Sequence, residues 1–425
     1  MTHIAVIGTG YVGLSTAVGL AELGHAVVGV DIDEHKISTL QSGVSPLDEA
    51  GITDALGRLL KSKTLSFSTD VLASVADASI VFLCLPTPQG DDGSADLSYI
   101  ENVACAIGSH LSSDAVVVNK STVPVGTSVQ VAKWLGREDI SVVSNPEFLR
   151  QGTALQDFLH PNRIVVGGDN GIAVEKVASL YSKIDAPILR MNAASAEALK
   201  YAANSFLATK LTFVNAIADI CELVGADIFD VVGGLGMDPR IGDQFLNPGP
   251  GWGGSCFPKD TRALVKIAEE QGYDFALLRG VIQTNDEQYE RIALKVVDVC
   301  GGSVEGKTIA AWGLTFKAHT DDLRDSPSIA ILTLLHKMGA TIRAYDASAR
   351  AVEQYTWIER CSSALEACEG ADALTVLTEW PEFAQVDPTA VASALRSASV
   401  VDGRNVLNIA AWKSAGFEYR GVGRN

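Results

Sequence analysis

The sequence has few basic side chains: 33 lysines and arginines stand against 51 aspartates and glutamates, a net charge of −18. Nucleic acids and anionic membranes need a basic face, so this balance argues against both as partners. The seven cysteines include no CxxC pair and no regular spacing. That excludes a disulfide framework and favours reduced thiols in a cytoplasmic protein. No uncharged apolar run approaches the roughly 18 residues of a spanning helix, and the first residues predict no signal peptide.

The length and composition fit a globular protein of more than one domain. Hydrophobic residues make up 47% of the chain and charged residues 20%. A chain of 425 residues exceeds a single ordinary core, so two or three domains are expected.

The first 31 residues carry the pattern of a dinucleotide-binding unit. A short apolar strand runs into GTGYVG, residues 8–13, a helix follows, and a second strand ends at Asp31, 18 positions after the last glycine. The glycines allow a tight turn, a close approach of pyrophosphate and close packing of helix on strand. Asp31 would accept from the ribose hydroxyls and repel a 2′-phosphate, which favours NAD over NADP. The alternative is a unit whose glycines are only structural.

Four more apolar segments continue this alternation, and each runs into a polar or proline-containing loop. They are residues 76–88, 114–127, 140–158 and 163–168. The first three place Thr87, Thr122 and Glu147 at the carboxyl ends of strands, where ligands bind in a doubly wound sheet. For the two threonines, ordinary turn chemistry is the alternative.

Residues 195–224 contain neither proline nor glycine and predict one long helix. At ~1.5 Å per residue it would extend roughly 45 Å, enough to join two domains. Lys200 and Asn204 lie four residues apart and share one face. Such a pair is ordinarily solvated, but apolar neighbours such as Phe206 predict a helix that is largely packed in.

The C-terminal part repeats the N-terminal organisation. Strand, helix and strand are predicted over residues 307–348, with Asp346 in the place that Asp31 has in the first unit. Residues 371–381 (ADALTVLTEWP) match residues 76–86 (ADASIVFLCLP) at the offsets of Ala-Asp-Ala, Val and Pro. The predicted fold is therefore α/β, with two Rossmann-like doubly wound domains joined by a long central helix. The second unit lacks GxGxxG, so it binds something other than NAD or is a purely structural duplicate.

The loop GPGWGGSCFPKD, residues 249–260, combines the composition of a phosphate cradle with one cysteine. A helical pattern follows, so Cys256 would lie near a helix N-terminus and beside Lys259, and both effects lower the pKa of a thiol. Asp260 stands four residues after the cysteine. This setting predicts that Cys256 is a nucleophile, whereas the other six cysteines are interpreted as small buried apolar groups.

Eight segments together resemble the UDP-glucose/GDP-mannose 6-dehydrogenase family. They occur in that family's order and span residues 8–405: GTGYVG, LPTP, STVPVGT, NPEFLRQG, LKYAANSFLATKLTFVNAIADI, GGSCFPKD, GLTFKAHTDDLRDSP and VVDGRN. GGSCFPKD and the segment ending in LRDSP are highly specific. The motifs match best the members that oxidise UDP-glucose. One departure is Gln151, where the family has glutamate in NPEFLREG, and it puts little in doubt.

Oxidation of a primary alcohol to a carboxylate removes four electrons, so each turnover needs two NAD. The resemblance implies that UDP-glucose becomes UDP-glucuronate, with Cys256 forming a thiohemiacetal and then a thioester that water hydrolyses. It implies that Lys200 stabilises an oxyanion or relays a proton, and that Asp260 orients or deprotonates water. The implied catalytic residues are Cys256, Lys200, Asn204, Asp260, Glu147 and Thr122, of which the last two assist the hydrolysis. No metal site is expected.

The resemblance also implies binding residues. The NAD contacts are Gly8, Gly10, Tyr11, Val12, Gly13, Asp31, Lys36, Thr87, Thr122, Glu147, Lys259 and Arg324. The contacts with the UDP-sugar are Phe148, Leu149, Arg150, Lys200, Asn204, Arg240, Phe245, Leu246, Asn247, Pro248, Gly249, Gly253, Lys317 and Arg404. In the family Arg240 reaches over from a neighbouring subunit, which implies a homodimer. Arg240, Arg324 and Arg404 could instead be ordinary surface charges.

The expected domains are residues 1–194, which bind NAD, residues 195–300, a central region for dimerisation and the active site, and residues 301–425, which bind the UDP-sugar. Three alternatives remain. The same reaction could act on GDP-mannose or an N-acetylated UDP-hexosamine, or the scaffold could be a non-catalytic nucleotide-sugar sensor. A sensor needs none of the catalytic residues. A 2-hydroxyacid dehydrogenase, the third alternative, explains neither the cysteine loop nor the repeat.

Overall fold

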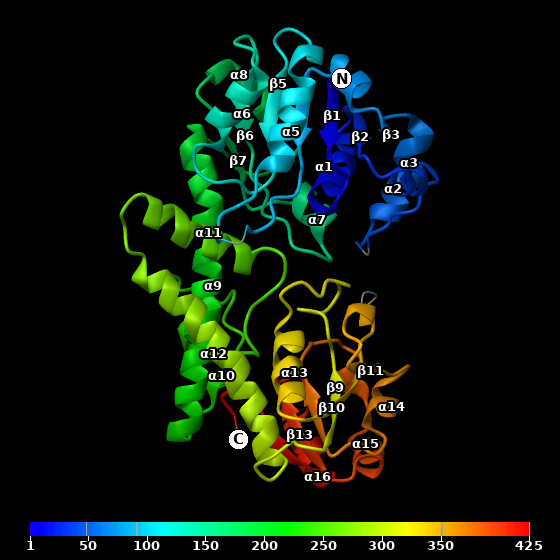
Figure 1. Ribbon diagram of the computed structural model, residues 1–425, viewed down its shortest axis with the longest axis vertical. Helices are drawn as coiled ribbons and strands as arrows, with labels where there is room; N and C mark the ends of the chain where they lie inside the picture. The colour runs from blue at the N-terminus through cyan, green and yellow to red at the C-terminus, as the bar shows by residue number, and fades with distance from the viewer. Residues whose placement is uncertain (48, 91, 350–351, 425) are drawn as a thin grey trace. The chain divides into compact units, whose positions relative to one another are not determined.

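The computed structural model describes residues 1–47, 49–90, 92–349 and 352–424, which form two compact α/β units (Figure 1). The first unit comprises Met1–Ala203 and Arg262–Tyr273, and the second comprises Asn204–Thr261 and Asp274–Asn425. The long helix α9 (Ala193–Val224) and helix α11 (Phe257–Glu270) each contribute residues to both units.

The first unit is built on an eight-stranded sheet in the order β3-β2-β1-β4-β5-β6-β7-β8. Its strands are β1 (His3–Ile7), β2 (Ala26–Val30), β3 (Leu65–Ser68), β4 (Ile80–Leu83), β5 (Val116–Asn119), β6 (Ser141–Ser144), β7 (Ile164–Gly167) and β8 (Ile188–Met191). Neighbours pair in parallel except β6 and β7, which are antiparallel. The order of the first six strands is that of a dinucleotide-binding sheet.

Helices cover both faces of this sheet. They are α1 (Tyr11–Glu22), α2 (Glu34–Gln41), α3 (Ile52–Ser62), α4 (Val71–Ala76), α5 (Ser98–Ile107), η1 (Gly108–His110), α6 (Thr127–Leu135), α7 (Ala154–Leu159) and α8 (Gly171–Ser179). In β1, Ile4 and Val6 join the apolar cluster of α1, α3 and α7, whereas Ala5 and Ile7 join that of α4, α5 and α6. Strands buried on both faces read as continuous apolar runs, which is how these strands stand in the sequence.

The second unit repeats the arrangement with a six-stranded, fully parallel sheet in the order β11-β10-β9-β12-β13-β14. Its strands are β9 (Thr308–Trp312), β10 (Thr341–Tyr345), β11 (Ile358–Arg360), β12 (Ala373–Val376), β13 (Ser399–Asp402) and β14 (Glu418–Arg420). The first two strands of each sheet pair over five residues, His3 opposite Ala26 in one unit and Thr308 opposite Thr341 in the other. The predicted fold class is therefore confirmed.

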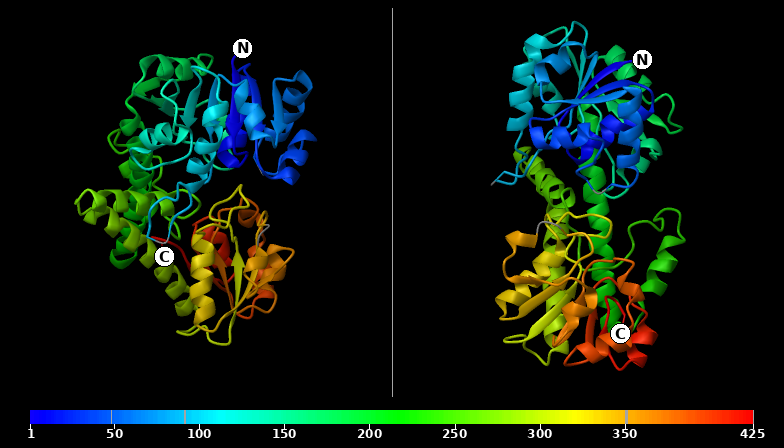
Figure 2. Two further views of the ribbon diagram at one scale, coloured as in Figure 1. Left: turned by 45° about the horizontal axis from the view of Figure 1, so that its top comes forward. Right: turned by 90° about the vertical axis from the view of Figure 1, so that its right-hand side faces the viewer.

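Helices also cover both faces of the second sheet (Figure 2). They are α10 (Ile228–Gly236), α12 (Ala276–Val299), α13 (Pro327–Lys337), η2 (Val352–Gln354), α14 (Ala364–Cys368), η3 (Phe383–Gln385), α15 (Pro388–Ala394) and α16 (Ile409–Ser414). One apolar cluster contains residues of α9, α12 and α13, and the other contains residues of α14, α15 and α16. Among the described residues, no helix combines the length and apolarity that crossing a membrane requires.

The predicted long helix forms, but the prediction that it is largely packed in is wrong for part of its length. Lys200 and Asn204 are buried, whereas Phe206 is 65% exposed. Phe213 and Ile220 are exposed as well, and with Phe206 they recur every seven residues on one face of α9. Residues seven apart lie only about 20° from each other around a helix, so these side chains form one stripe.

Candidate active site

The turn between β1 and α1 has the close packing that its glycine motif predicts. A Cβ at Gly13 would lie 1.8 Å from the carbonyl oxygen of Gly8, so only glycine fits there. Gly10 is exposed, and a Cβ built on it would meet nothing within 4 Å. The first turn of α1 therefore offers open space for a phosphate group beside its N–H groups.

Asp31 lies at the end of β2, and its carboxylate is bonded to the same turn. It accepts from the N–H and the hydroxyl of Thr9 and from Lys36 Nζ, each at 2.9 Å. Burial alone would raise the pKa of Asp31, but the hydrogen bonds from Lys36 and Thr9 outweigh it and lower the pKa overall. An ionised carboxylate here accepts from ribose hydroxyls and repels a 2′-phosphate, so these residues fit NAD.

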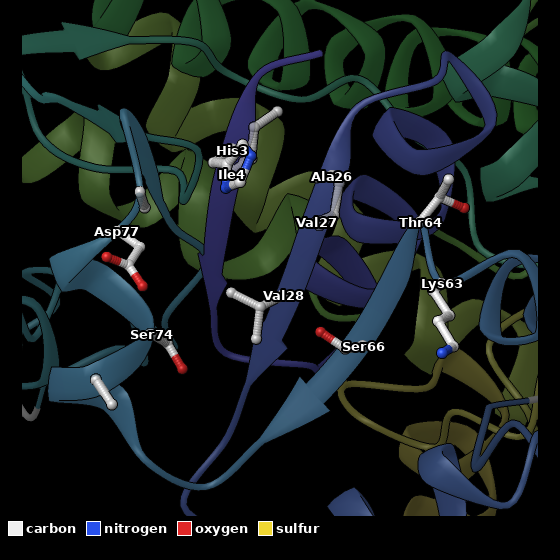
Figure 3. Close-up of a pocket in the computed structure, with 12 residues that line it drawn as sticks. His3, Ile4, Ala26, Val27, Val28, Lys63, Thr64, Ser66, Ser74 and Asp77 are labelled. Carbon is white, nitrogen blue, oxygen red and sulfur yellow. The ribbon is translucent and has the colours of Figure 1, made fainter.

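A pocket of about 340 Å³ lies at the opposite ends of the same strands (Figure 3). Its lining includes His3, Ala26 and Thr64, at or beside the amino ends of β1, β2 and β3, together with residues of α4. Gly10 and Asp31 follow the carboxyl ends of β1 and β2. This pocket is therefore not the cofactor site.

Glu147 and Lys200 form a buried ion pair in the first unit. Lys200 Nζ lies 3.0 Å from Glu147 Oε1, and both side chains are 5% exposed. The other carboxylate oxygen accepts from the Leu149 N–H at 2.5 Å. Burial alone would raise the pKa of Glu147, but Lys200, the Leu149 N–H and Lys120 outweigh it and lower the pKa overall. Glu147 is therefore held as an anion against a fixed cation.

The other predicted residues of the first unit lie near one another in smaller groups. The Thr87 hydroxyl donates to the carbonyl of Thr122 at 2.9 Å, which joins the loops after β4 and β5. Phe148 places its ring centroid 5.2 Å from the Lys200 ammonium. Arg150 is bound to Asp157 at 2.6 Å, and its side chain remains mostly exposed.

In the second unit, Asp260 brings together the residues predicted around the cysteine. Its buried carboxylate accepts from Asn204 Nδ2 at 2.6 Å and also from Lys259 Nζ. Its N–H donates to the Cys256 carbonyl at 3.0 Å, which is the first hydrogen bond of α11. Cys256 thus directly precedes α11, with its half-buried sulfur 3.7 Å from Ser255 Oγ. Asn204 follows Lys200 by one turn of α9.

Arg324 is a cation whose charge is coupled to Cys256. Its pKa is raised first by its hydrogen bond with Asp322 and also by the interaction with Cys256. Lys259, which the sequence places beside the thiol, donates to Asp260 instead. The resemblance names Arg324 as a contact of the cofactor, and the structure adds its electrostatic interaction with Cys256, which no local pattern in the sequence indicates.

Side chains of α12 hold the glycine-rich loop, and sequence reasoning missed them. Asn285 and Tyr289 bond the backbone of Trp252, and Gln288 bonds the carbonyl of Gly249, at 2.6–3.0 Å. At Gly253 a Cβ would lie 1.9 Å from the carbonyl oxygen of Asp325, so this position needs glycine. Polar residues spaced three and four apart on a helix were the available signal.

The remaining predicted residues of the second unit occupy different settings. Arg404 is mostly buried, bonds the carbonyls of Phe316 and Leu377 at 2.8 and 2.9 Å, and lies beside Gly249, so it is not an ordinary surface charge. Arg240 is 87% exposed, pairs with Asp238, and lies apart from that group. Leu246, Pro248 and Gly249 are buried, Phe245 and Lys317 are half-buried, and Asn247 is exposed.

The carboxylate of Asp346, the counterpart of Asp31, is engaged in hydrogen bonds within its own domain. Its carboxylate oxygen Oδ2 accepts from the N–H groups of Leu314 and Thr315 at 2.6 and 3.0 Å and from Trp380 Nε1 at 3.3 Å. The residue is buried. It is therefore closed to a ribose, which agrees with the loss of the glycine motif in this unit.

The open glycine turn and Asp31 define the first unit as that of a dinucleotide-dependent oxidoreductase. Three consecutive family models match the chain and name its parts. Residues 2–185 match the NAD binding domain, residues 194–287 the central domain, and residues 310–409 the UDP binding domain of the UDP-glucose/GDP-mannose dehydrogenase family. The protein belongs to this family.

Similar proteins cover the whole chain. UDP-glucose 6-dehydrogenase TuaD of Bacillus subtilis (strain 168) is 43% identical over 435 residues, covering 100% of this chain and 94% of its own. UDP-glucose 6-dehydrogenase of Pseudomonas aeruginosa is 42% identical, covering 99% and 97%. The solved structure of a UDP-glucose dehydrogenase from Pyrobaculum islandicum superposes with a TM-score of 0.92 at 36% identity, covering 100% and 98%.

Proposed function

We propose that this protein oxidises UDP-glucose to UDP-glucuronate with two molecules of NAD in each turnover. The observation that carries the proposal is the set of buried catalytic groups: the Glu147–Lys200 pair of the first unit and the Asn204–Asp260 pair beside Cys256 in the second. A non-catalytic sensor has no need for a buried ion pair or a cysteine at a helix N-terminus. Proteins named UDP-glucose 6-dehydrogenase at 42–43% identity over the full chain support UDP-glucose as the substrate.

The chemistry assigns each group a role. NAD, when bound, accepts two electrons from the substrate carbon in each oxidation. The Cys256 thiolate adds to the aldehyde to form a thiohemiacetal, whose oxidation gives a thioester. Lys200 donates to the oxygen on which negative charge develops, and Asn204 lies one turn along. Asp260 orients water or takes its proton, and hydrolysis then frees Cys256.

The binding residues follow the same division of the chain. We propose that NAD is held by Gly8 and residues 10–13 together with Asp31, Lys36, Thr87, Thr122, Glu147, Lys259 and Arg324. The UDP-sugar is held by residues 148–150, 245–249 and 253, with Lys200, Asn204, Arg240, Lys317 and Arg404. Residues 1–194, 195–300 and 301–425 then act as NAD-binding, central and UDP-sugar-binding domains.

We also propose that the protein is cytoplasmic, because its cysteines form no disulfide. A thiol-trapping assay in cell extracts tests whether these thiols are reduced in the cell.

The stoichiometry of the reaction tests the proposed function directly. The purified protein should form two NADH for each UDP-glucose consumed, because a four-electron oxidation needs two two-electron acceptors. NADH absorbance and product chromatography over UDP-glucose, GDP-mannose and UDP-N-acetylhexosamines check both the number and the sugar. One NADH per sugar with free aldehyde, or faster turnover of another sugar nucleotide, contradicts the proposal.

We also propose that the protein is a homodimer that pairs through the exposed stripe of α9. Phe206, Phe213, Ile220, Leu223 and Val224 are 51–86% exposed in the single chain, and a second copy would bury them. Arg240 supports the pairing, since its side chain is 87% exposed and, among the residues that the structure describes, its only ion pair is with Asp238. In the family that this chain resembles, the matching arginine binds the ligand of the neighbouring subunit, which would account for the exposure of Arg240.

A charge placed in the stripe should separate the subunits. Phe213→Glu is expected to sediment as a monomer at micromolar concentration, because each interface would bury two unpaired carboxylates. Ile172→Glu is the matched control, since Ile172 is 82% exposed on α8 and outside the stripe. A dimeric Phe213→Glu variant, or a monomeric unmodified protein, contradicts the proposed interface.

A further inference from the structure

Lys120 carries a buried ammonium that the proposed chemistry leaves unused. It follows β5 and is 5% exposed. Its Nζ donates to Asn145 Oδ1 at 3.1 Å and lies 6.0 Å from the ring centroids of Phe158 and Tyr181. No carboxylate in the described part of the chain forms an ion pair with it. Burying a charge without a counter-ion costs several kcal/mol, so an apolar residue would fill this volume at lower cost.

Asn145, which accepts the hydrogen bond from Lys120, is itself held in place by further hydrogen bonds. Asn145 follows β6, and its N–H donates to the carbonyl of Asn119 at 2.8 Å. Its Nδ2 donates to the carbonyl of Val165 at 2.6 Å, and the Tyr181 hydroxyl donates to its Oδ1 at 2.5 Å. The bond from Lys120 to Asn145 therefore cross-links the ends of two neighbouring strands. Thr122 stands two residues after the lysine, and Glu147 two residues after the asparagine.

The charges around this cross-link act on Glu147. Lys200 pairs with Glu147 directly, and Lys120 also lowers the pKa of that carboxyl. Burial lowers the pKa of Lys120 to about 8, but this value still lies above neutral pH, so the side chain stays mostly protonated. Two other titratable groups belong to this cluster. Burial raises the pKa of Cys84 to about 12 and also raises the pKa of Tyr181, so both stay neutral.

We propose that Lys120 is a positioning residue for the hydrolysis half of the reaction, holding Glu147 ionised and aligned through Asn145 and through its own charge. The inference rests on the proposed function. In the step concerned, a water oxygen bonds to the thioester carbon, the carbon–sulfur bond breaks and Cys256 leaves as a thiolate. Glu147 assists Asp260 in passing the two water protons to solvent, and the product is a carboxylate.

Three variants separate charge from packing. Lys120→Met removes the charge and the hydrogen-bond donor, Lys120→Gln removes the charge but keeps a donor on a shorter side chain, and Lys120→Arg keeps a permanent charge. Lys120→Met should lose about 10- to 100-fold in kcat, as expected for a displaced catalytic group. The acid limb of its kcat profile should move up by roughly one pH unit, because Glu147 loses a neighbouring cation. Lys120→Arg should keep the acid limb of the unmodified enzyme.

Intact-protein mass spectrometry after acid quench reports the step that slows. Lys120→Met should accumulate the sugar-nucleotide adduct on Cys256, while its first burst of NADH stays within about threefold of normal. Thermal melting and NAD-binding assays show whether Lys120→Met folds. If it does not fold, comparing Lys120→Gln with Lys120→Arg provides the same test.

Glu147→Gln is the control that separates this inference from the proposed function. Glu147→Gln should accumulate the adduct on Cys256 whether or not Lys120 has a role in positioning. If it shows no adduct, the thioester chemistry fails and the inference fails with it. If Glu147→Gln accumulates adduct, but the neutral Lys120 variants show neither adduct nor a moved acid limb, Lys120 is only structural and the inference alone is overturned.

Discussion

Replacing Cys256 by serine is expected to reduce steady-state oxidation of UDP-glucose by about 10³-fold or more, the range seen when a covalent nucleophile is removed. A serine hydroxyl is a much weaker acid and nucleophile than a thiol, and its ester is a poorer intermediate than a thioester. The backbone around the side chain should persist, because the Asp260 N–H bonds the backbone carbonyl of residue 256, which serine retains. NADH formation and calorimetric titration with NAD and UDP-glucose measure turnover and binding separately.

Binding is the part of this experiment that isolates the chemistry. Cys256→Ser should bind both ligands within about threefold of the unmodified protein, since the α12 side chains hold the loop through its backbone. Cys105→Ser is the matched control, because Cys105 is exposed on α5, far along the chain from this loop. Near-normal formation of UDP-glucuronate by Cys256→Ser would show that the loop is only a cradle for phosphate and that no thioester forms.

Local patterns in the sequence predicted the features that depend on neighbours along the chain. The glycine turn at residues 8–13 and the long helix α9 follow from local spacing, and the repeat in the second unit follows from the same local pattern recurring later in the chain. The Rossmann-like order of both sheets follows from the alternation of strand and helix. Four short strands, β3, β8, β11 and β14, were not predicted, because each contains polar residues and is only partly buried, so none forms a continuous apolar run.

Features that depend on tertiary contacts could not be predicted from the sequence. The exposure of Phe206 could not be read from α9 alone, since an apolar side chain has the same pattern whether its own chain or another chain covers it. Asp346 reads like Asp31 in sequence, yet its carboxylate is consumed by Leu314, Thr315 and Trp380. Partner residues separated by 30 or more positions decide whether a carboxylate is available or structural, and periodicity carries no information about them.

Removing the Lys200 ammonium should reduce both activity and stability, and the two losses can be separated. Lys200→Ala is expected to slow each step that builds charge on oxygen by about 10²–10³-fold, the cost of one lost oxyanion donor. It should also lower the free energy of unfolding by about 3–5 kcal/mol, because Glu147 stays buried without its counter-charge. Stopped-flow kinetics and urea unfolding measure the two effects on the same protein.

The pH dependence of stability distinguishes this cause from a simple loss of packing. With Lys200 present, the pKa of Glu147 is lowered, so the pair stabilises the fold fully above the usual carboxyl pKa, and this contribution is lost as the pH falls from there through the lowered pKa of the folded state. Without Lys200, burial should raise the pKa of Glu147, and the variant should regain stability on mild acidification. The double variant Lys200→Met with Glu147→Gln should recover most of the stability at neutral pH but none of the activity. If Lys200→Ala remains as active as the unmodified protein, or if the double variant regains activity, Lys200 only compensates the buried charge of Glu147.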